Sequence, residues 1–283
     1  MKKSKLICKT LLSLTMMIGL FVTLESDVSA VGSDPAFPAS SQPLHDAILA
    51  KYPAIDNAPS GNGDGVISQE EAASWGGSTI NIRNATITGT ITGIEYFTNT
   101  NLLSLYLDGN QFSGEIPSGI TNMSGLTIIN LVNNLLTGTI PTNIGNLTNL
   151  VSLHLHTNNL TGSIPVSIGS LSNLEQLEIS FNQLTGPIPN TLGNCSALRQ
   201  ILLHSNQLSG SIPESIGYLP LTRLTINKNN LSGEVPDSIF TNPTLRTLEI
   251  NDNAGLTGNP AEKIPADSAI EKLRIQGTDM VQA

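Results

Sequence analysis

Apolar residues recur in a fixed pattern with a period of 24 residues from residue 102 onward. The pattern is L-x-x-L-x-L-x-x-N-x-L-x-G-x-I-P, and the copy from Leu126 to Pro141 follows it with Ile129 at one leucine position. Other copies start at Leu102, Leu150, Leu174, Leu198 and Leu221, and a looser one starts at Leu245. Repeats of this length are typical of stacked coils, none of which can bury its apolar face alone.

Inside each copy two apolar residues flank a polar one, which predicts one short strand per coil with the apolar pair pointing inward. The inward pairs are Leu105 and Leu107, Ile129 and Leu131, Leu153 and Leu155, Leu177 and Ile179, Ile201 and Leu203, Leu224 and Ile226, and Leu248 and Ile250. Degenerate half-copies at Ile80–Ile82 and Ile270–Ile275 flank the array. The sequence therefore predicts an α/β-type solenoid in which each coil contributes one strand and one return segment.

An asparagine follows each predicted strand at the bend of the coil. These are Asn110, Asn134, Asn158, Asn182, Asn206, Asn229 and Asn253. Because a side-chain amide has two donors and an acceptor, a stacked column of asparagines can pair with backbone groups of successive turns. We therefore predict a structural role for the column. The glycine and proline in the second half of each copy predict a compact return path that ends strand pairing.

The segment Gln111–Pro117 and its recurrences, x-x-S/T-G-x-I-P, resemble the second half of plant-type leucine-rich repeats. The resemblance covers residues 102 to about 250, where several positions recur in register. It implies a horseshoe with a concave parallel sheet, a short second sheet after the asparagine and 3-10 turns on the convex side. The paired-cysteine caps of that family are missing, because the chain has only Cys8 and Cys195.

Residues 1–30 have the features of a secretory signal peptide, with four lysines, an apolar run from Leu11 to Leu24 and a small-residue exit site ending at Ala30. The apolar run is too short to span a bilayer comfortably, since about 20 residues are needed. We expect a secreted protein, extracellular or loosely associated with the cell surface, without a membrane span. The net charge of −9 argues against nucleic acid and anionic lipid as partners.

The region between the signal peptide and the repeats predicts a small helical N-terminal cap. Pro43–Tyr52 has the pattern of a short helix with Pro43 in its first turn. The loop Gly61–Glu71 and the segment Gly93–Asn99 resemble the N-terminal cap of internalin-like bacterial surface proteins, which implies a bacterial surface protein. The expected domains are a signal peptide at 1–30, the helical cap at 31–78, the repeats at 79–260 and a C-terminal cap at 261–283.

The loop in the N-terminal cap has the spacing of a degenerate EF-hand. Its candidate calcium ligands are Ser60, Asn62, Asp64, the carbonyl of Val66, and Glu71. Ser60 stands where an aspartate is expected, and a missing charged ligand weakens such a site. The alternative is a metal-free cap in which Ser68 and Glu71 form a capping box for the next helix. No cofactor other than calcium is expected.

The residues that alternate with the inward pairs should form an exposed face of the sheet. The candidate binding residues on this face are Tyr106, Asp108, Ile128, Asn130, Val132, His154, His156, Glu178, Phe181, Leu202, His204, Arg223 and Lys228. Apolar and aromatic groups in an exposed column suggest anchors for a partner. The alternative is scattered surface hydrophobes, which soluble proteins always show.

Three histidines on this face could suggest a metal site. However, His156 and His204 are two coils apart, roughly 9 to 10 Å, which is too far for one zinc ion. His154 and His156 supply only two ligands, where zinc needs three or four. The sequence also has no nucleophile elbow and no phosphate-binding loop, so we predict a protein that is not an enzyme.

The leading prediction is a monomeric binding protein that recognises an extracellular or cell-surface protein through the concave face. The alternative is carbohydrate or matrix binding, for which Trp75 and four tyrosines offer few stacking platforms. Ice binding is a third hypothesis, because one hydroxyl recurs in each coil. The hydroxyl residues are Ser113, Thr137, Thr161, Thr185, Ser209, Ser232 and Thr257. The repeat motif itself requires serine or threonine there, which explains the column without ice.

Overall fold

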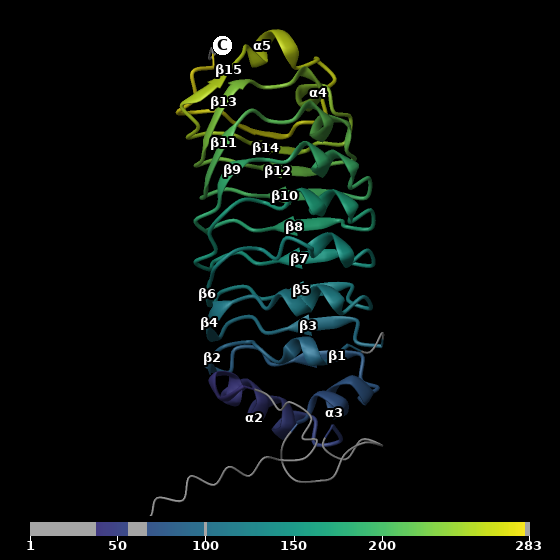
Figure 1. Cartoon of the computed structure of the whole chain (residues 1–283). Coiled ribbons are helices and arrows are strands. Elements are labelled where there is room, and N and C mark those ends of the chain that lie inside the picture. Colours follow the sequence, from purple (N-terminus) through teal and green to yellow (C-terminus); the bar gives the residue numbers. More distant parts are fainter. Residues whose placement is uncertain (1–37, 56–66, 99–100, 281–283) are drawn as a thin grey trace, which may run out of the picture. The chain divides into compact units, whose positions relative to one another are not determined.

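The computed structural model of the protein describes residues 38–55, 67–98 and 101–280 (Figure 1). The predicted signal peptide, residues 1–30, lies outside these residues. Within the described part of the chain, no helix is long and apolar enough to cross a membrane.

Nine short parallel strands form the main sheet, one from each coil. In spatial order they are β1 (Thr79–Asn81), β3 (Ser104–Tyr106), β5 (Ile128–Asn130), β7 (Ser152–His154), β8 (Gln176–Glu178), β10 (Gln200–Leu202), β12 (Arg223–Thr225), β14 (Thr247–Glu249) and β16 (Lys272–Arg274). Equivalent repeat positions face one another, as Leu153 pairs with Ile129 on one side and Leu177 on the other. The outer strands β1 and β16 come from the two half-copies, so the sheet continues past residue 260, the predicted end of the repeats.

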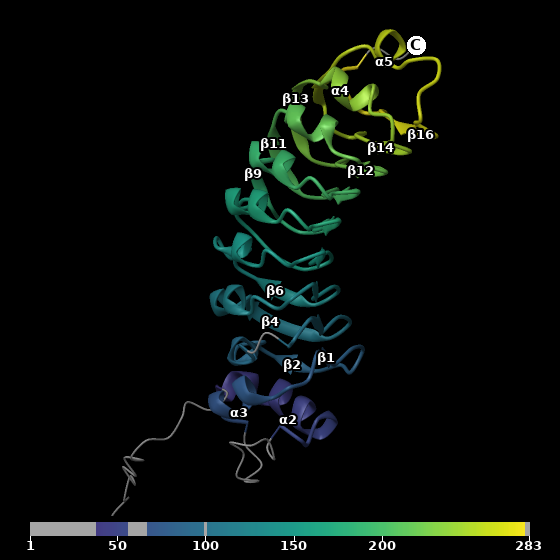
Figure 2. The same ribbon diagram turned by 90° about the vertical axis from the view of Figure 1, so that its right-hand side faces the viewer.

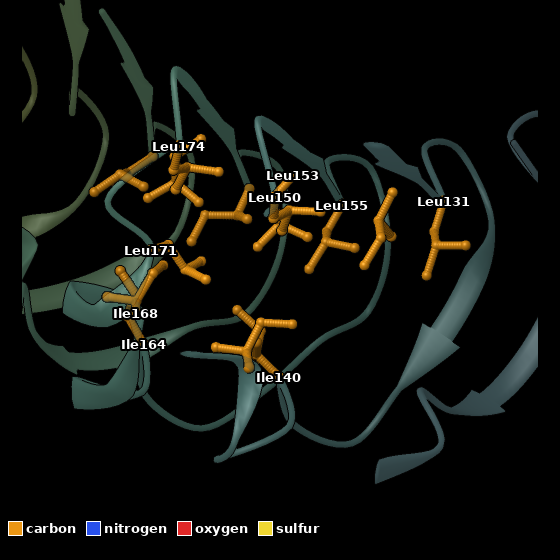
Figure 3. Packing of buried hydrophobic residues seen from close by; sticks show 14 of the residues in the cluster. Leu131, Ile140, Leu150, Leu153, Leu155, Ile164, Ile168, Leu171 and Leu174 are labelled. Atoms are coloured by element: carbon orange, nitrogen blue, oxygen red, sulfur yellow. The ribbon is translucent and has the colours of Figure 1, made fainter. Parts of the chain in front are cut away.

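The inward side chains of successive coils form one continuous core. Leu153 and Leu177 are almost fully buried, as are their equivalents along the stack. Figure 3 shows Leu150, Leu153 and Leu155 stacked beside Leu174 under the sheet. Cys195 belongs to the same cluster, and burial raises the pKa of its thiol to about 11. The thiolate is therefore a minor species at neutral pH, as expected for a cysteine that packs in the core.

The asparagine column forms the predicted ladder. In Asn158 the amide nitrogen donates to the carbonyl oxygens of Leu131 at 3.0 Å and Leu155 at 3.1 Å, and the amide oxygen accepts from the N–H of Leu136 at 3.0 Å. The other six asparagines make the same set of bonds. Each one therefore ties its own coil to the preceding coil.

After the ladder asparagine the chain forms further short strands. A three-stranded sheet contains β2 (Thr88–Gly89), β4 (Gln111–Glu115) and β6 (Leu135–Thr137), and a four-stranded sheet contains β9 (Thr185–Pro187), β11 (Gln207–Gly210), β13 (Asn230–Glu234) and β15 (Gly255–Thr257). The single second sheet expected from the repeats is thus divided in two. The intervening coil continues the contact through a bridge between Thr139 and Thr161, and the Thr161 N–H donates to the Gly138 carbonyl at 2.7 Å.

Short helices form the return path of the coils. They are η2 (Ile94–Tyr96), η3 (Ser118–Asn122), η4 (Ile144–Asn146), η5 (Val166–Ser170), η6 (Asn190–Asn194), η7 (Glu214–Tyr218), α4 (Asp237–Phe240) and α5 (Pro260–Lys263). Figure 2 shows them on the side of the described coils opposite the nine-stranded sheet, which lies on the inner side of the bend. The expected 3-10 turns on the convex side are confirmed, except that the last two coils have α-helical turns.

The N-terminal cap contains η1 (Ala39–Ser41), α2 (Gln42–Lys51) and α3 (Gln69–Ser74). Leu44 and Ile48 of α2 are fully buried, and the helix has a proline in its first turn, as predicted. Helix α3 begins with the predicted capping box. Its Ser68 N–H donates to the Glu71 carboxylate at 2.8 Å, and the Glu71 N–H donates to the Ser68 hydroxyl at 3.2 Å.

Candidate binding face

We define the sheet face as the outward-pointing residues of the nine-stranded sheet and of the turn after each strand. Most of the predicted binding residues are half-buried or exposed on this face. They are Tyr106, Ile128, Asn130, Val132, His154, His156, Glu178, Phe181, His204, Arg223 and Lys228. Strand pairing places them in columns, so that His154 lies between Asn130 and Glu178 on neighbouring strands.

Two predicted residues are not available as exposed contacts. Leu202 is only 9% exposed, between Glu178 and Thr225 on the neighbouring strands, so the expectation that it is an exposed anchor is wrong. Asp108 is also 9% exposed, and its carboxylate pairs with the Arg83 guanidinium at 2.7 Å. Both side chains are covered by neighbours from adjacent coils, which the alternation within a single strand does not reveal.

Arg83 is a sheet-face residue that sequence analysis missed. Besides pairing with Asp108, its guanidinium lies over the ring of Tyr106, 5.2 Å from the ring centroid. The sequence could have placed Arg83 on the face. It directly follows the inward pair of the half-copy, Ile80 and Ile82, as Asp108 follows the inward pair one coil later. The N-terminal end of the face is therefore organised by a cation, an anion and an aromatic ring.

The middle of the face contains three histidines, each with a partner. His154 Nε2 is 3.0 Å from the side-chain oxygen of Gln176, and His156 Nε2 is 3.8 Å from the Glu178 carboxylate. The His204 imidazole meets the Phe181 ring edge to face, with centroids 4.8 Å apart. Among the described residues, no group of three histidine, cysteine or acidic side chains is placed to hold a metal ion.

The C-terminal end of the face is centred on Glu249, which is 8% exposed. Its carboxylate pairs with Lys272 and lies 3.8 Å from the Arg274 guanidinium, both on β16. Burial raises the pKa of Glu249, but the hydrogen bond and charge of Lys272, together with Arg274 and Arg223, outweigh it and hold the pKa below its ordinary value. The alternation along the strand predicts that Glu249 points outward. Its pairing with Lys272 and Arg274 could not be predicted, because both lie in a half-copy that matches the repeat pattern poorly.

Burial lowers the pKa of both His156 and His204. The Glu178 carboxylate opposes this shift for His156, while the positive charge of Arg223 adds to it for His204. Because both pKa values lie below the ordinary value for histidine, the imidazoles of His156 and His204 are mostly neutral near pH 7.

These histidines should make the fold less stable in mild acid. In the unfolded chain their pKa values return to about 6.5, so the unfolded state binds more protons below that pH. The free energy of unfolding should fall as the pH drops from 7.5 to 5.5, and a His156→Gln, His204→Gln double variant should show a smaller fall. Urea unfolding at the two pH values measures this. Equal pH dependence in both proteins would show that the imidazoles do not contribute.

The predicted calcium loop is only partly within the described residues. Ser60, Asn62, Asp64 and Val66 lie outside them, whereas Glu71 is buried and one of its carboxylate oxygens accepts from the Ser68 N–H. The capping box is confirmed, and calcium binding stays a prediction.

Comparisons with known proteins bear on the repeats. A family model described as leucine rich repeat matches residues 148–208, and a second leucine rich repeat model matches residues 101–123 and 125–147. No curated protein matches the sequence. The N-terminal region before residue 101 is not covered by these models, so the internalin-like cap stays a prediction.

Several solved structures are similar. The ectodomain of the receptor kinase GASSHO1/SCHENGEN3 from Arabidopsis thaliana, in complex with CASPARIAN STRIP INTEGRITY FACTOR 2, is 31% identical with a TM-score of 0.67, over 74% of this chain and 26% of that one. The plant peptide hormone receptor RGFR1 in complex with RGF2 is 29% identical with a TM-score of 0.55, over 68% and 38% of the two chains. The present chain thus spans well under half of either receptor.

A plant ice-binding protein is similar over a larger share of its own length. It is 26% identical with a TM-score of 0.66, over 76% of this chain and 69% of that one. The matching family models, these structures and the observed coils agree on one architecture. The chain is therefore a leucine-rich-repeat protein with repeats of the plant type.

Proposed function

We propose that the protein binds another protein through the sheet face. The observation that carries this proposal is the contrast between the two sides of each strand. Inward positions repeat the same aliphatic residues, whereas outward positions vary in size and charge along the sheet, as Tyr106, His154 and Glu178 do in one column. A scaffold does not require this variety, while recognition of one particular partner does.

The similar structures support a protein or peptide as the partner. GASSHO1/SCHENGEN3 and RGFR1 were both solved in complex with such ligands. The predicted signal peptide and the acidic charge of the chain support an extracellular or cell-surface location and a partner other than nucleic acid.

Replacing Tyr106, His154 and Phe181 together by alanine should reduce partner retention at least about tenfold, because truncated anchors dominate the loss of binding energy. Retention from solubilised surface proteins is measured by pull-down and quantified for the protein that the unchanged chain retains. Because all three side chains lie on the outer side of the sheet, the coils should stay folded in circular dichroism.

The matched control replaces three exposed apolar residues away from the sheet face, Leu135, Val166 and Tyr218, which are 50%, 71% and 73% exposed. This control variant should retain the partner as the unchanged protein does. Equal retention by both variants would place the site elsewhere. Retention of polysaccharide instead of protein, measured on a polysaccharide panel, would favour the carbohydrate alternative.

Ice binding is a second candidate, supported by the similar plant ice-binding protein and by the hydroxyl column. All seven hydroxyl residues are at least partly exposed, six in the two smaller sheets and Thr161 in the bridge between them. However, the hydroxyls of Ser113, Thr161 and Thr185 already donate to glycine carbonyls of the preceding coil, at 3.3, 3.1 and 3.4 Å. A thermal-hysteresis measurement tests this candidate, and an absence of hysteresis would exclude it.

A further inference from the structure

The outward side of strands β12 and β14 carries buried oxygen atoms that lack hydrogen-bond partners. Among the described residues they include Thr225 Oγ1, Asn227 Oδ1 and Asn251 Oδ1. Thr225 is 1% exposed and Asn227 is 9% exposed. Leaving a buried polar atom unpaired destabilises a fold, and nearly all such atoms in proteins have a partner. Three of them on adjacent coils therefore point to a ligand that supplies hydrogen-bond donors.

We call Thr225, Asn227 and Asn251 the acceptor cluster. Thr225 and Asn227 are two residues apart on one side of the chain, about 6.6 Å along the strand. The pairing of β12 with β14 continues past the strands, because the Lys228 N–H donates to the Asn251 carbonyl at 2.9 Å. Asn251 therefore lies beside Asn227, at the strand spacing of about 4.8 Å. Its amide nitrogen donates to the Asp252 carboxylate at 2.6 Å, which leaves the amide oxygen for another donor.

Access to the acceptor cluster depends on side chains. The described chain has no further helix or strand on the outer side of the nine-stranded sheet (Figure 2). The cluster is therefore covered by side chains of the sheet face, which can turn aside when a ligand approaches. A ligand of this size has to reach across only two coils.

The charges beside the acceptor cluster decide what kind of donor it can accept. The cations are Arg223, Lys228, Lys272 and Arg274, and the acids are Glu249 and Asp252. Lys272 and Arg274 share the Glu249 carboxylate. Arg223 and Lys228 are exposed, and no ion pair between described residues includes either of them. Oxygen ligands alone would suit a calcium ion, but the surplus of positive charge repels a metal ion or a basic group. The donors must therefore be neutral, and an acidic group next to them is favoured.

An extended polypeptide fits this arrangement of acceptors. Its N–H groups point to the same side at every second residue, about 6.6 Å apart, which is also the spacing of Thr225 and Asn227. We infer that the acceptor cluster binds an acidic polypeptide segment of the partner, which donates neutral N–H groups to the three oxygens and places a carboxylate against Arg223 and Lys228. The inference rests on the proposed function, since it names a contact site on the sheet face and the chemistry of the partner.

The test compares the same substitution at two buried threonines. Thr225→Val removes a hydroxyl that has no partner in the free protein, so it should raise Tm by about 2 °C. It should also weaken binding of the segment about fivefold, because one hydrogen bond to the segment is lost. The matched control is Thr121→Val on η3, away from the sheet face. Thr121 is 5% exposed and its hydroxyl donates to the Ser118 carbonyl at 2.8 Å. This variant should lower Tm by about 2 °C and bind the segment as the unchanged protein does.

The probe is a library of random peptides displayed on phage and selected on the immobilised full chain, with the polysaccharide panel in parallel. The selected peptides should be rich in aspartate and glutamate. Synthetic copies should bind Thr225→Val about fivefold more weakly than the unchanged chain, and an Arg223→Gln, Lys228→Gln double variant at least about tenfold more weakly.

A fall in Tm for Thr225→Val would show that the hydroxyl has a partner in the free protein, and would overturn the inference. Selected peptides without acidic residues, or acidic peptides that bind Thr225→Val as tightly as the unchanged chain, would overturn it as well. Binding of a polysaccharide alone, with no peptide selected, would have the same consequence. The proposed function is judged separately, because it stands in each of these cases if the triple alanine variant loses its protein partner.

Discussion

Asn182→Ala is expected to lower the free energy of unfolding by about 3 kcal/mol, the largest effect we expect from a single truncation. The amide nitrogen of Asn182 donates to the carbonyl oxygens of Leu155, Ile179 and Ser180 at 3.1 to 3.2 Å. Its amide oxygen accepts from the buried N–H of Leu160 at 3.0 Å. Alanine removes all four bonds and leaves the buried N–H of Leu160 without a partner, out of reach of water. The carbonyl oxygens of Leu155, Ile179 and Ser180 each lose one of two bonds and keep those from Asn158, Asn206 and Thr157.

The control for this prediction is Asn173→Ala. Asn173 is exposed and makes one hydrogen bond, from its amide to the Thr148 carbonyl at 2.9 Å. Because water can replace that bond, the expected loss is under about 1 kcal/mol. Urea unfolding followed by circular dichroism measures both variants. Similar losses for the two substitutions would mean that the ladder contributes no more than a surface bond, and its structural role would have to be abandoned.

The ladder and the main sheet could be predicted from the sequence because they repeat in register. Leu153 and Asn158 are interchangeable with their equivalents in other coils, so the period alone identifies both the inward side and the bend. The same argument placed β1 and β16 from half-copies only a few residues long. Each repeat packs against copies of itself, so equivalent positions meet the same neighbours and need the same residue types. The recurrence of those residues is therefore visible in the sequence.

The details of the binding face could not be predicted in the same way. The burial of Leu202 depends on the side chains of Glu178 and Thr225 in the neighbouring coils. The pairing of Asp108 depends on Arg83, in the degenerate half-copy. Such contacts join residues more than 20 positions apart that do not repeat, so no period reveals them. The sequence also does not reveal that Phe181 has left-handed backbone, with φ 51°, because threonine, serine and lysine occupy the same position in other coils.

Glycines in the short helices of the return path also stack from coil to coil, which sequence analysis missed. Gly145→Ala is expected to lower the free energy of unfolding by about 3 kcal/mol. A Cβ atom at Gly145 would lie 2.1 Å from the backbone oxygen of Ser167 in the next coil. Gly169 meets Thr191 in the same way, at 2.4 Å. The strand side of the stack is held at fixed spacing by the ladder and the sheet, so the helix side cannot open locally to admit the methyl group.

Gly76→Ala is the matched control, because a Cβ atom there meets nothing within 4 Å. It should change the free energy of unfolding by less than about 0.5 kcal/mol. Thermal melting of the two variants separates the explanations. If Gly145→Ala melts well below Gly76→Ala, the close approach of successive return segments contributes to stability, and glycine is needed there because a Cβ atom would force the segments apart. If the two melt together, the return segments adapt freely, and the ladder and the nine-stranded sheet alone set the spacing of the coils.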